Sequence, residues 1–87
     1  MSAVVRHQVR ARVAGTDRSS LLTLLAAIHA RGVEVREAHF GPTEREEVRE
    51  LRAVFDAEAS RATTLAATLG ELIDVVAVSL ESGPDPR

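Results

Sequence analysis

Residues 14–35 read AGTDRSSLLTLLAAIHARGVEV, and this stretch decides the fold of the chain. Four aliphatic residues in it recur at i, i+3, i+4 and i+7, the spacing that gathers side chains on one face of a helix. They are Leu21, Leu24, Leu25 and Ile28. We therefore predict a helix over residues 19–31 whose apolar face covers a sheet.

The two ends of this helix carry capping signals. Thr16, Asp17 and Ser19 offer side-chain oxygens to the unpaired amides of the first turn, and Gly32 can adopt the left-handed conformation that ends a helix. A helix N-terminus also presents amide groups and a dipole that can hold an anion, such as the carboxylate of an amino acid. A functional site is therefore expected at the start of this helix.

Four segments have the composition or alternation of strands. Residues 5–13 alternate between an apolar face with His7 and a charged face of arginines, and residues 48–57 alternate in the same way. The apolar phase of residues 33–40 slips near Arg36 or Glu37, which predicts a bulge. Residues 73–80 are apolar and largely β-branched, so we predict a last strand there.

A second helix is predicted over residues 59–72, with Ser60 as its cap and its apolar residues at helical spacing. The predicted element order is therefore βαββαβ. This order is typical of the α+β ferredoxin-like sandwich, in which a four-stranded antiparallel sheet carries two helices on one face. The other face is left open and charged. We expect a single domain over residues 1–82 and a disordered tail over residues 83–87.

Composition excludes several classes of function. The chain has 87 residues, no cysteine and 2% aromatic residues, so its core must be aliphatic around Phe40 and Phe55. A net charge of −2 gives no electrostatic attraction to nucleic acid or to an anionic membrane. The sequence has neither an apolar run long enough to span a membrane nor the layout of a signal peptide. A cytoplasmic location is expected.

No constellation of residues predicts catalysis or metal binding. His7, His29 and His39 lack a second ligand at a metal-binding spacing, so neither a metal nor a cofactor is expected. Ser19 and Ser20 stand where serine ordinarily caps a helix. The acidic residues between positions 44 and 47 fall in a polar turn, away from any expected cleft. No catalytic residue is predicted.

The chain resembles the ACT domain, a small amino-acid-binding regulatory module with the same βαββαβ order. Five short motifs resemble more narrowly the short type of the regulatory small subunit of acetolactate synthase (acetohydroxyacid synthase). They are HQV at 7–9, RGVEV at 31–35, GPTE at 41–44, LIDVV at 72–76 and VS at 78–79. The resemblance implies a homodimer joined edge to edge through the second strand, with an amino-acid effector bound between the two copies.

The resemblance also implies which residues bind the effector. On one copy they are Thr16, Asp17, Ser19, Ser20 and Leu21, and on the other they are Glu34 and Val35. Two positions depart from the family pattern, because a serine replaces the glycine of the turn and Glu34 replaces an asparagine. The serine side chain fills space near the effector carboxylate, and Glu34 adds repulsion. We therefore expect valine, leucine and isoleucine to bind weakly or not at all.

These features predict a noncatalytic protein. The leading hypothesis is a regulatory subunit that activates the catalytic subunit of a thiamine-diphosphate-dependent acetolactate synthase in branched-chain amino acid biosynthesis. The alternative is a free-standing ACT homodimer that senses another amino acid or small ligand. An enzyme of the same fold is disfavoured because no acid, base or nucleophile converges in a cleft.

Overall fold

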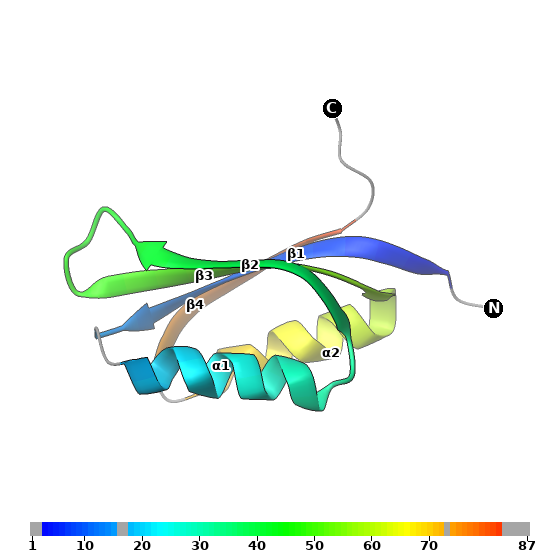
Figure 1. The fold of residues 1–87 in the computed structure, drawn as a ribbon, viewed down its shortest axis with the longest axis horizontal. Coiled ribbons are helices and arrows are strands. Elements are labelled where there is room, and N and C mark those ends of the chain that lie inside the picture. Colours follow the sequence, from blue (N-terminus) through cyan, green and yellow to red (C-terminus); the bar gives the residue numbers. More distant parts are fainter. Residues whose placement is uncertain (1–2, 16–17, 73, 83–87) are drawn as a thin grey trace.

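The computed structural model describes residues 3–15, 18–72 and 74–82, and its elements follow the predicted order βαββαβ (Figure 1). The bounds are β1 Val4–Ala14, α1 Arg18–Ala30, β2 Glu34–Pro42, β3 Val48–Glu58, α2 Ala59–Gly70 and β4 Val75–Ser82. Each element lies within two residues of its predicted bounds. The predicted sites at Thr16 and Asp17 and the predicted tail over residues 83–87 lie outside the described residues.

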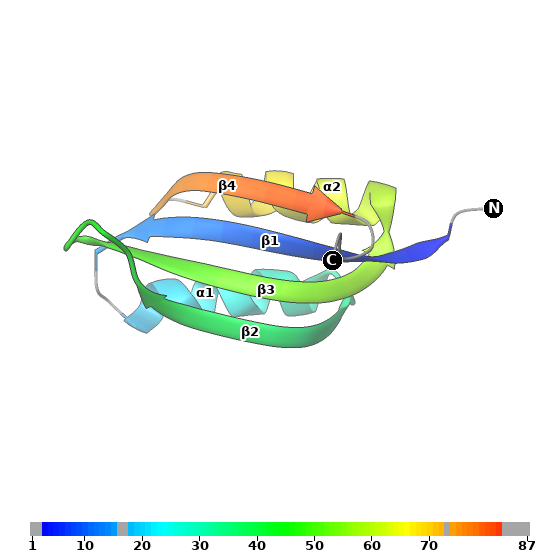
Figure 2. The same cartoon turned by 90° about the horizontal axis from the view of Figure 1, so that it is seen from above.

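The four strands form one antiparallel sheet in the order β2-β3-β1-β4. β1 and β3 are therefore the central strands, and β2 and β4 are the edges. Both helices lie against the same face of the sheet (Figure 1), and Figure 2 views the molecule from the opposite, open face. This arrangement confirms the predicted ferredoxin-like sandwich.

The predicted bulge in the second strand is confirmed. The register between β2 and β3 runs regularly up to Val35, which pairs with Phe55, and resumes at Glu37, which pairs with Val54. Arg36 is the extra residue, one of the two positions that the slip of the apolar phase indicated. Because one residue is inserted, Ala38 and Phe40 return to the side of the sheet that Val35 occupies.

The helix ends are partly as predicted. Gly32 has φ of 69°, so it ends α1 in the predicted left-handed conformation. The prediction that Ser60 caps α2 was wrong, because the helix begins at Ala59 and its N-cap residue Glu58 makes no side-chain cap hydrogen bond. Within the described residues, no helix combines the length and the apolar character needed to cross a membrane.

The prediction that Leu25 belongs to the buried face of α1 was also wrong. Leu24 and Ile28 are each 1% exposed, and Leu21 packs against the core, but Leu25 is 37% exposed. Ser20 is buried instead. Successive residues of a helix are separated by 100°, so a face centred on Leu24 turns Leu25 toward its rim. The helix therefore lies rotated toward Ser20, which brings its start against the neighbouring α2–β4 connection.

The core is aliphatic around one aromatic ring. Its largest fully buried apolar side chains come from both layers: Phe55, Leu24, Ile28, Leu51, Leu65, Leu69, Val9 and Val13. His7 is buried among them and stacks on Phe55 with ring centroids 5.3 Å apart. Its Nε2 donates to the carbonyl of Ala57 at 2.8 Å, and its Nδ1 lies 2.7 Å from the hydroxyl of Ser82. His7 is therefore a satisfied core histidine that joins β1, β3 and β4.

Ion pairs cover parts of the open sheet face. Asp56 accepts from Arg36 at 2.8 Å and from Arg6 at 3.2 Å. Arg12 donates to Glu44 at 3.2 Å and to Glu50 at 3.3 Å. The hydrogen bond from Arg36, with that from Arg6, lowers the pKa of Asp56, and the bonds to Glu44 and then Glu50 raise the pKa of Arg12. The face is therefore charged, as predicted.

The pKa of Asp56 leads to a pH-dependent prediction. Because its pKa is lower in the folded protein than in the unfolded chain, the ionised carboxylate stabilises the fold above the unfolded value of about 4. This stability is lost as the pH falls through the folded value. Asp56→Asn should therefore melt below the wild type at pH 7 and approach it below about pH 4. Thermal melts followed by circular dichroism test this, and a gap that is unchanged at low pH would contradict it.

Candidate functional site

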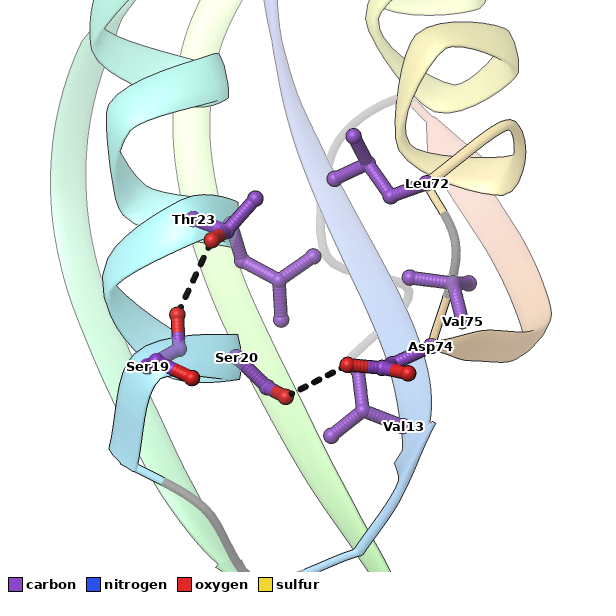
Figure 3. Close-up of a pocket in the computed structure, with 8 residues that line it drawn as sticks. Val13, Ser19, Ser20, Thr23, Leu72, Asp74 and Val75 are labelled. Atoms are coloured by element: carbon purple, nitrogen blue, oxygen red, sulfur yellow. Dashed lines mark hydrogen bonds between the residues drawn. The ribbon is translucent and has the colours of Figure 1, made fainter.

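A small pocket lies beside the first turns of α1, with a volume of about 140 Å³ (Figure 3). Its walls come from the end of β1, from α1 and from the connection between α2 and β4. The lining residues are Val13, Ser19, Ser20, Thr23, Leu24, Leu72, Asp74 and Val75. Three separate parts of the sequence therefore meet where the sequence predicted a site.

The polar side of the pocket is built on a hydrogen bond between two of these parts. Ser20 is 7% exposed, and its hydroxyl donates to Oδ2 of Asp74 at 3.2 Å. Figure 3 shows the two side chains pointing toward each other from α1 and from the α2–β4 connection. On the helix itself, the hydroxyl of Thr23 donates to the carbonyl of Ser19 at 2.9 Å. Asp74 is exposed, so its carboxylate remains accessible at the rim of the pocket.

Backbone hydrogen bonds hold Asp74 in place. The amide of Ala14, the last residue of β1, donates to the carbonyl of Asp74 at 2.8 Å. The amide of Val75 donates to the carbonyl of Leu72 at 3.1 Å, which closes a turn around Asp74. The position of this carboxylate is therefore fixed by β1 as well as by Ser20.

The other side of the pocket is apolar. Val13 and Leu24 are each 1% exposed, and Leu72 and Val75 are partly buried against the same core. A carboxylate next to an aliphatic wall can accept hydrogen bonds from an ammonium group while the wall contacts an aliphatic chain. The described residues contain no group of three or more histidine or acidic side chains placed to hold a metal ion.

The structure brings together only part of the predicted effector site. Ser19 and Ser20 line the pocket, and Leu21 packs against the core at its side. Glu34 and Val35 are exposed at the start of β2, which follows the end of α1. A helix of 13 residues is about 20 Å long, so these two residues of the same chain lie far from Ser19. Any contact between the two halves requires a second copy of the chain.

Asp74 lines the pocket but was not predicted as a site residue. The predicted strand over residues 73–80 includes Asp74, whereas β4 begins at Val75 and Asp74 precedes it. One signal was present, since Asp74 is the only charged residue between positions 72 and 80. A lone carboxylate in an apolar run indicates a position that turns away from the sheet.

Comparison with solved structures assigns the fold to the ACT-like class of ferredoxin-like sandwiches. The ACT domain of GTP pyrophosphokinase from Chlorobium tepidum matches with a TM-score of 0.76 and 12% identity, covering 91% of this chain and all of that one. The C-terminal domain of the MgtC protein from Mycobacterium tuberculosis matches with a TM-score of 0.71 and 19% identity, covering 92% of this chain and 88% of that one.

A similar region also occurs inside a larger enzyme. A homoserine dehydrogenase from Thiobacillus denitrificans matches with a TM-score of 0.72 and 11% identity over 93% of this chain, which corresponds to 18% of the enzyme chain. No protein-family model and no curated protein matches the sequence. At these identities the comparisons establish the ACT-like fold that the sequence predicted.

The pair formed by Ser20 and Asp74 predicts unequal effects of two substitutions. Asp74→Ala leaves the buried hydroxyl of Ser20 without this acceptor, and an unsatisfied buried polar group costs about 1 to 3 kcal/mol. Ser20→Ala removes the hydroxyl but leaves a carboxylate that water can still solvate. Urea unfolding should therefore show the larger loss for Asp74→Ala. Equal losses, or a larger loss for Ser20→Ala, would contradict the assigned burial of this pair.

Proposed function

We propose that this chain is a noncatalytic regulatory subunit that forms a homodimer through β2, binds an amino acid between the two copies and activates a thiamine-diphosphate-dependent acetolactate synthase in the cytoplasm. The observation that carries the proposal is the edge of β2, which no other described segment pairs with. This strand has β3 as its neighbour on one side, and residues 34–39 are all exposed. An open strand edge is a template for pairing with another chain.

The edge of β2 lacks two of the features that oppose pairing, although it has the bulge at Arg36 and charged side chains. It contains no lysine, its proline stands at its last residue, and Val35 is 42% exposed. A domain of 87 residues also buries a small core, so a continuous sheet across two copies adds stability that one copy lacks. These properties favour a homodimer with β2 beside β2.

The topology explains how such a dimer would complete the effector site. β1 and β2 are both antiparallel to β3, so they run in the same direction and finish at the same end of the sheet. α1 begins at that end of the sheet, next to the pocket. In an antiparallel pair of β2 strands, the start of the second copy's β2 lies beside the end of the first. Glu34 and Val35 of the second copy would then approach the start of α1, the turn of the helix that carries Ser19 and Ser20.

The pocket indicates the chemistry of the amino acid. The carboxylate of Asp74 would accept hydrogen bonds from its ammonium group, and Leu24 and Val75 would contact an aliphatic side chain. The start of α1 supplies the amide groups that suit its carboxylate. The exposed Glu34 opposes that carboxylate, which supports the expectation of weak binding for valine, leucine and isoleucine.

The acetolactate synthase assignment is supported by where the resembling motifs lie. The motif at 31–35 crosses the start of β2, and the motif at 72–76 contributes Leu72, Asp74 and Val75 to the pocket. Each motif therefore belongs to one half of the proposed effector site: the motif at 31–35 to the half on β2, and the motif at 72–76 to the half at the pocket.

Reconstitution with a catalytic subunit tests the function. The chain should co-elute with a purified acetolactate synthase catalytic subunit and raise its turnover, measured as acetolactate formed from pyruvate. Asp74→Ala is the matched variant, because it should alter the response to amino acids while leaving the β2 edge intact. A dimer that neither binds the catalytic subunit nor changes its rate would contradict this assignment.

The alternative is a free-standing homodimer that senses another amino acid or small ligand. The open edge of β2 supports this alternative as much as it supports the regulatory subunit, because neither the dimer nor the effector site that it would complete needs a catalytic partner. In that case calorimetry should show that an amino acid binds the isolated dimer and that Asp74→Ala weakens this binding. The rate of acetolactate synthase would stay unchanged.

A further inference from the structure

Two arginines lie side by side at the centre of the open sheet face. Arg10 on β1 and Arg52 on β3 are directly opposite each other in the strand register. Both are exposed, and within the described residues neither side chain makes a hydrogen bond or an ion pair. Figure 2 looks onto this face, where β1 and β3 run side by side along the middle of the sheet.

The other arginines of this face are paired. Arg6 and the bulged Arg36 both bond Asp56, and Arg12 bonds Glu44 and Glu50. Like charges directly opposite on neighbouring strands destabilise a sheet. The arginines on either side are therefore neutralised by carboxylates, whereas Arg10 and Arg52 are not. Their repulsion weakens the fold unless an anion lies between the two guanidinium groups.

The same row of the sheet extends the pair with further hydrogen-bonding side chains. His39 on β2 is opposite Arg52, and Ser79 on β4 is opposite Arg10, so the row crosses all four strands. His39 and Ser79 are both exposed. A row that reads histidine, arginine, arginine and serine offers donors to an oxyanion without placing a carboxylate among them.

Carboxylates limit the size of the anion. In the next row Glu37 is opposite Val54 and Glu81 is opposite Gln8, so acidic side chains stand at both ends of that row. On the other side, Glu50 is held by Arg12. An extended polyanion would meet these carboxylates, whereas a compact anion would contact the central row alone. A second copy stacked on this centre would bring four arginines together and is also disfavoured.

We propose that Arg10 and Arg52 form a binding site for the phosphoryl group of a small molecule, flanked by His39 and Ser79. Two guanidinium groups match the charge of a phosphate dianion, and the planar fork of arginine suits its oxygens. The site lies on the face opposite the helices and the pocket, so it is independent of the proposed amino-acid site.

Inorganic phosphate provides the probe. In thermal melts at equal ionic strength, phosphate should raise the Tm of the full chain above its value in chloride. Arg52→Gln and Arg10→Gln should each raise the Tm in chloride, because the repulsion is relieved, and should weaken phosphate binding at least tenfold. The control is Arg45→Gln in the hairpin, which removes an exposed arginine that is paired with Glu47. It should keep the full phosphate response.

A second measurement does not depend on any variant. Phosphate added to the isotope-labelled wild type should shift the amide NMR signals of residues around Arg10 and Arg52 before those of the pocket. Shifts centred on another surface would overturn the proposal. So would an equal loss of response in Arg45→Gln, or an oligoglutamate peptide that binds this face more tightly than phosphate does.

Discussion

Phe55→Ala should lower the free energy of unfolding by about 3 to 5 kcal/mol, the usual cost of removing a buried phenylalanine. Phe55 is 0% exposed and is the largest fully buried side chain of the described residues. Its ring also stacks on His7, so the substitution leaves a cavity beside a buried polar group. A domain of this size has a total stability of about 5 to 10 kcal/mol, so much of the fold would be lost. Urea unfolding measures the change.

Leu22→Ala is the control for this prediction. It removes an aliphatic side chain that is 59% exposed on α1, so its effect should stay within about 0.5 kcal/mol. A loss comparable to that of Phe55→Ala would mean that the outer face of α1 is covered. A small effect of Phe55→Ala would contradict the core assigned to this sheet.

Val35→Lys should convert the proposed homodimer into a monomer. Val35 lies at the start of the β2 edge and is 42% exposed, and lysine on an edge strand opposes pairing with another chain. Light scattering after size-exclusion chromatography should give twice the chain mass of 9.4 kDa for the wild type and the single mass for the variant. Because the proposed amino-acid site spans two copies, ligand-induced stabilisation should disappear with the dimer.

The opposite edge of the sheet offers a matched control. Val76 on β4 is 60% exposed, so Val76→Lys makes the same change at the edge that the proposal leaves unpaired. This variant should keep the dimer mass. If Val76→Lys dissociates the dimer and Val35→Lys does not, the copies pair through β4. A wild type that is monomeric at micromolar concentration would contradict the dimer itself.

The element order and the bulge could be read from local patterns. Alternation in strands and 3.6-residue periodicity in helices depend on residues close in the chain, so the fold class followed from them. The slip near Arg36 or Glu37 appeared in the sequence for the same reason, and the register between β2 and β3 confirms it and identifies Arg36 as the inserted residue. Gly32 was predicted to end α1 because a left-handed residue is a local requirement.

The rotation of α1 and the position of Asp74 depended on tertiary structure. Leu25 and Ser20 each fit a helix face by spacing, and packing against the α2–β4 connection decided that Ser20 is the buried one. Its partner Asp74 is 54 residues away, and the contact forms because β1 holds the backbone of Asp74. No local pattern encodes a contact between segments that the fold alone brings together.

The open sheet face also has one property that the sequence determines and one that the tertiary structure decides. The alternation of β1 placed Arg10 among exposed charged residues, a property of one strand that the sequence by itself determined. That Arg10 stands opposite Arg52, while Arg6 and Arg12 stand opposite Asp56 and Glu50, follows from the register of two strands far apart in the chain. Register is set by how the two apolar faces meet the helices, so the tertiary structure decided which charges are compensated.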